Sequence, residues 1–333
     1  MSKNKIVIGL AWLLALLLTA FLIRNISFMA ILESIAKLSL AQCLLWLTVN
    51  LIIIGIFVQR WSCLAKGIRQ NIGFLNLFML RQAGQSISFI TPGPQFGGEP
   101  LQVYLLWKKF FIAPAKAVLL VATDRFFELW INFAVLLLGV FFLLFSESEL
   151  LNLFTIAWIL ASLIFLLSIL AWVFIKQGDK IERMVDSLAE KWLHSSRLAK
   201  MTVHWEVFNN SLRLLLSDTK TLISALCFSI SGWLLTFVEL YLVLSFFDIT
   251  LSINNFIFLM VVMRLAFLLP LPGGIGTLEA AVIWSFSSMD LSISVAAAVL
   301  ALIRFRDILV LAAGLYCLRV LQTKTVPVAY FQH

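Results

Sequence analysis

The side chains most able to do chemistry in this sequence are charged residues inside long apolar segments. Arg125 and Glu128 are three residues apart in one segment, and Arg304 and Asp307 have the same spacing in another. Residues three apart share a helix face, so each pair can form an ion pair or contact one ligand together. A charge at the centre of a bilayer costs roughly 2.5–3.5 kcal/mol on insertion scales, and it persists where it pairs or faces water. Two interpretations stay open: the pairs lock helices together, or they line a cavity and bind a charged group.

Each charged pair follows a break rich in proline and glycine. The breaks are TPGPQFGGEP (91–100) and LPLPGGIGTLEA (269–280), and in both a Pro-Gly dipeptide precedes a glutamate, Glu99 or Glu279, by seven and six positions. Arg125 follows Glu99 by 26 residues, and Arg304 follows Glu279 by 25. The shared pattern is P-G-x5-E, a gap of about 25 residues, and then R-F-x-[ED]. Four elements at matched spacing predict an internal duplication.

The glycines at the two breaks are candidates for binding an anion through the backbone. A short helix is predicted to begin after each break, and its N–H groups and dipole would attract a phosphate. The backbone candidates are Gly97, Gly98, Gly273, Gly274 and Gly276. Glu99 and Glu279 would lie at these helix N-termini. They either satisfy the unpaired backbone donors or take part in substrate and proton binding, and both alternatives stay open.

Further charges lie in neighbouring apolar segments, among them Arg81 and Asp124, which are not in the candidate set. Arginine can make bidentate contacts to phosphate. The phosphate candidates are Arg125, Arg264, Arg304 and Arg306. The whole set of substrate or cavity candidates is Glu99, Arg125, Glu128, Glu239, Arg264, Glu279, Arg304, Arg306 and Asp307.

The elements that must position these residues are membrane helices. Hydrophobic residues make up 62% of the 333 positions and charged residues 13%, which is too apolar for one water-soluble core. Apolar stretches long enough to cross a bilayer cover 6–23, 41–59, 117–145, 153–175, 219–246 and 293–321. The first follows Lys3 and Lys5, but no small-residue cleavage site follows it closely, so we expect a retained anchor.

Two further apolar regions, 74–107 and 255–289, are interrupted by the breaks. The second arm of each is too short to cross the bilayer, so both regions predict re-entrant hairpins that face a cavity. The predicted fold class is an all-α polytopic membrane protein with two inverted-topology repeats, six full spans and two re-entrant helical hairpins. The expected divisions are repeat 1 (1–145), repeat 2 (146–321) with a cytoplasmic helical insert (176–218), and a short cytoplasmic tail (322–333).

The net charge of +8 follows the positive-inside rule rather than a nucleic-acid footprint. Basic residues concentrate in the 176–220 segment, whereas the loop at 146–152 carries Glu147 and Glu149 without a basic residue. We therefore expect a multi-pass protein of the cell membrane (inner or plasma membrane) with cytoplasmic N- and C-termini. The four cysteines are far apart and the three histidines lie in polar segments, so no metal site, disulfide framework or cofactor is expected.

At these motifs the sequence resembles the lysylphosphatidylglycerol synthase transmembrane-region family, a flippase-like group of bacterial and archaeal membrane proteins. The resemblance rests on GGEPLQVYLL (97–106), ATDRFFEL (122–129), LPGGIGTLEAAV (271–282) and LIRFRD (302–307), and it covers roughly residues 5–321. It implies translocation of a phospholipid or an isoprenoid-linked lipid. In larger relatives this unit is similar to the flippase half of a lipid-aminoacylating protein, with a soluble synthase domain after it. This chain ends about twelve residues after the last span, so aminoacyl transfer is not expected.

Three functions are compatible with these features. The first is a lipid flippase or transporter that moves an anionic phospholipid or polyprenyl (isoprenoid-linked) lipid through a central charged cavity, with no catalytic residues of its own. The second is a membrane-embedded enzyme of lipid or glycan metabolism, which requires Glu99, Glu128 and Glu279 to converge. The third is a non-catalytic partner of a separate lipid- or glycan-modifying enzyme, which would dock on 176–220.

Overall fold

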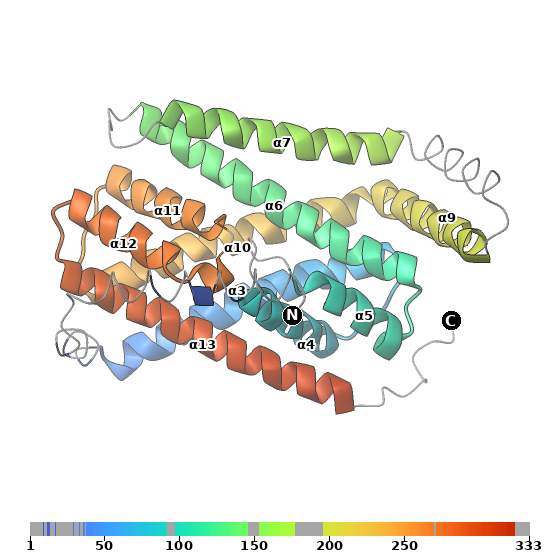
Figure 1. Ribbon diagram of the computed structural model, residues 1–333, viewed down its shortest axis with the longest axis horizontal. Helices are drawn as coiled ribbons and strands as arrows, with labels where there is room; N and C mark the ends of the chain where they lie inside the picture. The colour runs from blue at the N-terminus through green and yellow to red at the C-terminus, as the bar shows by residue number, and fades with distance from the viewer. Residues whose placement is uncertain are drawn as a thin grey trace.

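The computed structural model describes residues 38–91, 97–145, 153–176, 196–269 and 271–323, with isolated positions before residue 38. Every regular element in these ranges is a helix, so the prediction of an all-α protein is confirmed (Figure 1). The elements are α3 (Leu40–Gly67), α4 (Phe74–Ile90), α5 (Glu99–Phe110), α6 (Pro114–Leu144), α7 (Leu153–Lys176), α9 (Ser196–Ser217), α10 (Thr219–Phe246), α11 (Ile253–Phe267), η1 (Pro272–Gly274), α12 (Thr277–Ser288) and α13 (Ile293–Thr323).

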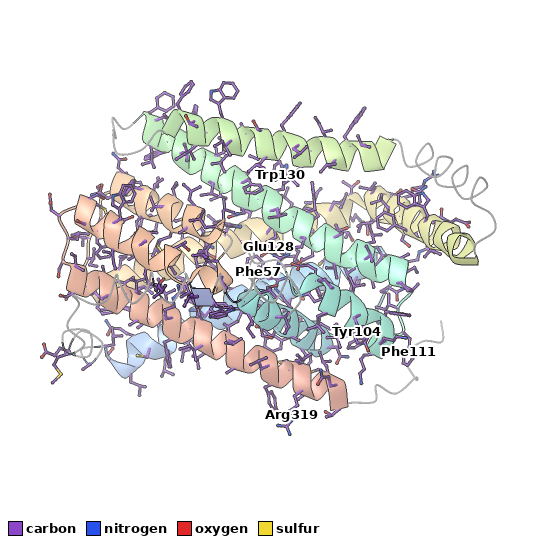
Figure 2. All side chains as sticks on the ribbon, in the orientation of Figure 1. Phe57, Tyr104, Phe111, Glu128, Trp130 and Arg319 are labelled. Carbon is purple, nitrogen blue, oxygen red and sulfur yellow. The ribbon has the colours of Figure 1, made fainter. Side chains whose placement is uncertain are left out.

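Five of the six predicted spans correspond to α3, α6, α7, α10 and α13, and the first, 6–23, lies outside the described ranges. Within those ranges α3, α6 and α10 are long and apolar enough to cross a membrane, and α7 and α11 contain shorter apolar helices. Helix α7 exposes large apolar side chains such as Trp158, 64% exposed, and Phe165, 68% exposed. Figure 2 shows side chains that project from the outer side of this helix. A water-soluble protein rarely exposes so large an apolar patch, whereas lipid covers it. The chain is therefore an integral membrane protein.

One boundary differs from the sequence prediction. The span expected at 41–59 continues as α3 to Gly67, with Ser39 capping its start through the N–H of Gln42. This extension brings Arg60 inside the helix, where its side chain is almost completely buried. The apolar stretch ends at Arg60 in the sequence because the arginine is charged, but an internal carboxylate compensates that charge, as described below.

The two interrupted regions fold as pairs of short helices. In the first, α4 and α5 meet at the glycine-rich break, where residues 92–96 lie outside the described ranges. A Cβ atom on Gly98 would lie 2.0 Å from the carbonyl oxygen of Gly84, so glycine is required for α5 to approach α4. In the second, η1 separates α11 from α12, and Gly273, Gly274 and Gly276 have positive φ angles that favour glycine. Both breaks thus bring two helix ends into contact inside the molecule.

The two helix pairs lie toward opposite ends of the long axis in Figure 1, with α4 and α5 on the right and α11 and α12 on the left. The right end also holds the C-terminus of α13, because the Lys109 ammonium donates to the carbonyl oxygen of Gln322 at 2.7 Å. The same end holds the junction of α9 and α10, since Gly67 of α3 lies against Leu215 and Thr221. In Figure 1, α4 and α5 together begin and end toward the right of the molecule, and α11 and α12 begin and end toward the left.

Long-range packing joins the two parts of the chain. Helix α4 packs along α13 and α3 packs along α10, so the tightest neighbours come from opposite halves. Helix α9, the described part of the insert expected at 176–218, packs against α6, and Leu215 is buried in the apolar core. Residues 177–195 of that insert lie outside the described ranges.

Candidate functional site

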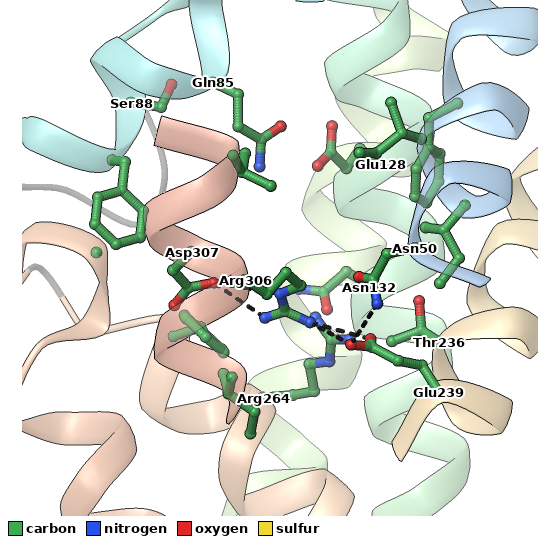
Figure 3. A pocket seen from close by; sticks show the side chains of 18 of the residues that line it. Asn50, Gln85, Ser88, Glu128, Asn132, Thr236, Glu239, Arg264, Arg306 and Asp307 are labelled. Carbon is green, nitrogen blue, oxygen red and sulfur yellow. Dashed lines mark hydrogen bonds and ion pairs between the residues drawn. The ribbon is translucent and has the colours of Figure 1, made fainter. Parts of the chain in front are cut away.

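A cavity of about 300 Å³ lies at the centre of the helix packing. Side chains from α3, α4, α6, α10, α11 and α13 line it, with Gly273 of η1 (Figure 3). Its volume is at the lower end of the range for small-molecule sites. The charged residues of the lining are Arg81, Arg125, Glu128, Glu239, Arg264, Arg306 and Asp307. Neutral polar side chains, among them Asn50, Gln85, Asn132 and Thr236, lie between these charges.

The first ion-pair cluster ties the break between α4 and α5 to α6. Arg125 contacts the carboxylate of Glu99 and also pairs with Glu128, Nη1 to Oε2, at 3.1 Å. The second carboxylate oxygen of Glu99 accepts the backbone N–H of Gly97 at 2.8 Å, and Ser88 Oγ accepts that of Gly98 at 2.9 Å. The glutamate at the start of α5 therefore caps its own helix and holds an arginine at the same time.

The second part of this cluster is centred on Asp124, the residue before Arg125. Asp124 accepts from Arg60 Nε at 2.7 Å and from Arg81 Nη1 at 3.0 Å, so one aspartate joins α3, α4 and α6. Arg60 also donates to Ser229 Oγ of α10 at 3.1 Å. Glu128 is 3.7 Å from Arg60 and 3.8 Å from Arg81, measured between side-chain nitrogen and oxygen. Three arginines and three carboxylates thus balance within this group.

The second cluster repeats this arrangement at the other break. Arg304 contacts both carboxylate oxygens of Glu279, Nε to Oε1 at 2.7 Å and Nη2 to Oε2 at 2.9 Å. It also donates to the carbonyl oxygens of Gly273 and Gly274 at 3.0 Å each. Glu279 accepts the N–H of Gly276 at 2.7 Å, as Glu99 does with Gly97. The duplicated sequence pattern therefore folds into the same glutamate-capped helix start held by an arginine.

The remaining charges of the second cluster face the cavity. Arg306 contacts both oxygens of Glu239, at 2.9 and 3.0 Å, and pairs with Asp307 at 3.1 Å (Figure 3). Glu239 Oε1 also accepts from the Trp46 indole and from the Asn50 amide, both at 3.3 Å. Asp307 contacts Arg304 as well, at 3.0 Å, as the three-residue spacing predicts. This network connects α3, α10 and α13.

The structure divides the sequence candidates into two groups. Those that line the cavity are Arg125, Glu128, Glu239, Arg264, Gly273, Arg306 and Asp307. Those outside the lining are Glu99, Glu279, Arg304, Gly97, Gly98, Gly274 and Gly276. The N–H groups of Gly97, Gly98 and Gly276 already have protein acceptors in this conformation. An anion at either break would therefore have to displace a glutamate or a serine.

The span predicted at 41–59 ends just before Arg60, and the predicted candidate set omits Arg60, Arg81 and Asp124. The structure makes these three residues one buried ion-pair group. A signal was present: Arg60 directly follows an apolar stretch, and the helix continues through apolar residues such as Trp61 and Leu64 to Gly67. Extending the span by two turns would have placed Arg60 in the interior.

The glutamates that an enzyme would need do not form one catalytic group. Glu99 and Glu279 belong to separate clusters, and Glu128 contacts arginines. Across the described part of the chain, no three His, Cys, Asp or Glu side chains gather as a metal site would require.

The fold and the site together define a class of protein: an all-α polytopic membrane protein with a charged cavity between its helices. The chain belongs to the family described as the lysylphosphatidylglycerol synthase TM region, whose model matches residues 6–314.

Two archaeal proteins are similar over most of their length. A UPF0104 membrane protein of Methanothermobacter thermautotrophicus is 25% identical over 283 residues, which cover 80% of this chain and 81% of that protein. A UPF0104 membrane protein of Methanocaldococcus jannaschii is 24% identical over 252 residues, covering 73% and 74%. The match to a lipid-related membrane family agrees with the resemblance inferred from the motifs.

Proposed function

We propose that this protein translocates a lipid across the membrane and that the polar headgroup passes through the central cavity. The observation that carries the proposal is the cavity itself, which places four arginines and three carboxylates inside a chain otherwise suited to hydrocarbon. Such charges are costly in a membrane, and where they line a hollow they mark the path of a polar substrate. The substrate class is an anionic phospholipid or an isoprenoid-linked lipid.

The arrangement of the two helix pairs supports alternating access. Each pair has the same glutamate–arginine contact at its break, and the pairs lie toward opposite ends of the long axis (Figure 1). Inverted repeats with broken helices beside the substrate site are the architecture of many secondary transporters. We infer that 1–145 and 146–321 are inverted repeats, that 74–107 and 255–289 are re-entrant hairpins, and that the halves rock about the cavity.

The distribution of charge supports an orientation. Helices α3, α5 and α13 end, and α10 begins, toward the right of Figure 1, and basic residues lie near these helix ends: Lys66, Lys108, Arg319 and Lys220. Asp248 and Asp290 follow α10 and α12, which end on the left. By the positive-inside rule the basic end faces the cytoplasm, in a cell membrane.

A membrane-embedded enzyme is the second candidate, and the ion pairs argue against it. Every cavity-lining carboxylate contacts an arginine, so none is placed as an unpaired general base or nucleophile in this conformation.

The test is lipid movement in proteoliposomes with a cavity-filling variant. Thr236 lines the cavity, and its hydroxyl donates to the carbonyl oxygen of Gly232 one turn earlier. Thr48 makes the same bond to Leu44 on an exposed face of α3, so it is the matched control. We expect Thr236→Phe to reduce the movement of labelled lipid to the level of empty vesicles, because the ring fills the headgroup path. Thr48→Phe is expected to leave it unchanged.

The assay would use labelled phosphatidylglycerol, phosphatidylcholine and a polyprenyl phosphate. Movement that continues in Thr236→Phe would exclude the cavity as the path. Wild-type protein that moves none of the three lipids, while covalently altering one of them, would favour the enzyme.

A further inference from the structure

We propose that Arg264 is the residue that binds the substrate's charge and that its ligand is a singly charged phosphate diester. Arg264 lies in the last turn of α11 and lines the cavity. The lipid nature of the ligand rests on the proposed function, whereas the anion site rests on the geometry around this arginine.

Arg264 differs from the other arginines of the cavity in its partners. Arg81, Arg125 and Arg306 each have a carboxylate oxygen within 3.1 Å. Among the described residues, no carboxylate is within ion-pair distance of Arg264, although Arg306 and Glu239 line the same cavity (Figure 3). An anion can therefore bind Arg264 without competing with a carboxylate, whereas the other three arginines already pair with one.

The charge balance points to one negative charge. The two clusters together hold five arginines and six carboxylates, and Asp124 and Asp307 each contact two of these arginines. Arg264 lies outside both clusters and has no direct counter-charge among the described residues. On the cavity lining itself, arginines exceed carboxylates by one. A monoanion would neutralise this excess, whereas a buried guanidinium without a counter-ion is costly.

The immediate surroundings of Arg264 suit a phosphate joined to an apolar chain. Its guanidinium carbon lies 4.6 Å above the centroid of the Trp233 ring of α10, so one face of the group is held by an aromatic ring. The stacked guanidinium keeps its N–H groups free to make a bidentate contact with phosphate oxygens. Met260, Met263 and Phe267 of α11 line the cavity beside it and offer apolar surface.

The experiment measures lipid retention by the full chain in detergent, using native mass spectrometry. The probes are phosphatidylglycerol, diacylglycerol with the same acyl chains, and inorganic phosphate as the free source of the same chemistry. We expect phosphatidylglycerol to be retained in preference to diacylglycerol, and Arg264→Gln to weaken its binding about tenfold, as the loss of a charged hydrogen-bonding group predicts. Arg264→Lys should keep part of the affinity, because lysine keeps the positive charge but cannot make the bidentate contact.

The matched control is Arg319→Gln, which removes an arginine from the exposed end of α13, outside the cavity. Binding of phosphatidylglycerol that is unchanged in a folded Arg264→Gln protein would overturn the site. Inorganic phosphate that displaces phosphatidylglycerol at equal concentration would overturn the lipid assignment. If Arg264→Gln does not fold, lipid retention is compared between Thr236→Phe and Thr48→Phe. Equal retention in these two variants would refute a binding site in the cavity.

The proposed anion site and the proposed transport function can be refuted independently. Anionic lipid that depends on Arg264 for binding but does not cross vesicles would leave the site standing and remove the proposed function. Lipid movement that persists unchanged in Arg264→Gln would leave the function standing and remove the assignment of Arg264.

Discussion

Arg304 illustrates how a charge that resembles a substrate contact can be a structural one. Its guanidinium contacts Glu279, Asp307 and the two carbonyl oxygens of Gly273 and Gly274. These carbonyl groups belong to η1, at the break, where no regular helix supplies backbone donors. The arginine therefore completes the hydrogen bonding of irregular backbone, which in an integral membrane protein must be satisfied where water does not reach it. At this residue the structure favours the lock over the ligand contact.

Removing the Arg304 side chain is predicted to lower stability. Arg304→Gln removes the positively charged donor from Glu279 and from two carbonyl groups, and breaking such a buried pair costs about 3 kcal/mol. The measurement is thermal unfolding of the purified protein in detergent, with Arg319→Gln as the exposed control. The double variant Arg304→Gln with Glu279→Gln should recover part of the loss, because no uncompensated carboxylate remains. An Arg304→Gln protein that unfolds at the wild-type temperature would mean that the Arg304 ion pairs do not stabilise the fold.

At the level of elements, the fold depends on close contact between α4 and α13. Gly314 of α13 lies against α4, and a Cβ atom there would be 2.4 Å from the carbonyl oxygen of Gln82 and 2.7 Å from Ser86 Cβ. The contact is between a helix and the backbone of its neighbour, so a larger residue cannot be accommodated by moving a side chain. Small residues of this kind allow membrane helices to approach closely.

Gly314→Ala is predicted to destabilise the protein by about 1–3 kcal/mol, the usual effect of overpacking. Gly55 of α3 is the matched control, because a Cβ atom there has no neighbour within 4 Å. Gly55→Ala should be neutral or stabilising by up to about 1 kcal/mol, since alanine favours the helix. Thermal unfolding of the two variants separates the effect of packing from that of helix propensity. Equal unfolding temperatures for Gly314→Ala and Gly55→Ala would contradict the close approach of α13 to α4.

For the whole molecule, the path of the chain between its two ends is the feature that the proposed mechanism requires. Helix α10 runs from the end that holds Lys220 to the end that holds Thr250, while α11 and α12 leave that end and return to it (Figure 1). If this long axis is the membrane normal, residues 250 and 292 lie on one side and residue 220 lies on the other.

Single cysteines in a background without the four native cysteines test this topology. Lys220→Cys, Thr250→Cys and Ser292→Cys place thiols at exposed positions flanking α10 and the pair formed by α11 and α12. A membrane-impermeant maleimide added to intact cells is expected to label positions 250 and 292, and to reach 220 only after the membrane is opened. A hairpin that crosses the membrane would instead put 250 and 292 on opposite sides.

The class of fold, most span positions and the helix starts after the two breaks follow from the sequence alone. Helix length and apolar composition depend only on neighbouring residues, so five described helices match their predicted spans. The spacing of Pro-Gly, glutamate and arginine also predicted that Arg125 and Arg304 would recur in equivalent places. The structure places both against the glutamates of their own breaks.

Which charges face the cavity and which support the backbone depends on how the helices pack against one another. Glu239 pairs with Arg306, 67 residues away, and Asp124 pairs with Arg60, 64 residues away. Such partners depend on how α3, α4, α6, α10 and α13 pack, and no local pattern encodes that packing. For the same reason the sequence ranked Arg264 equally with Arg304. Arg304 contacts acceptors on four residues, whereas Arg264 is stacked on Trp233 with no carboxylate at ion-pair distance among the described residues, and this difference arises from the arrangement of helices in space.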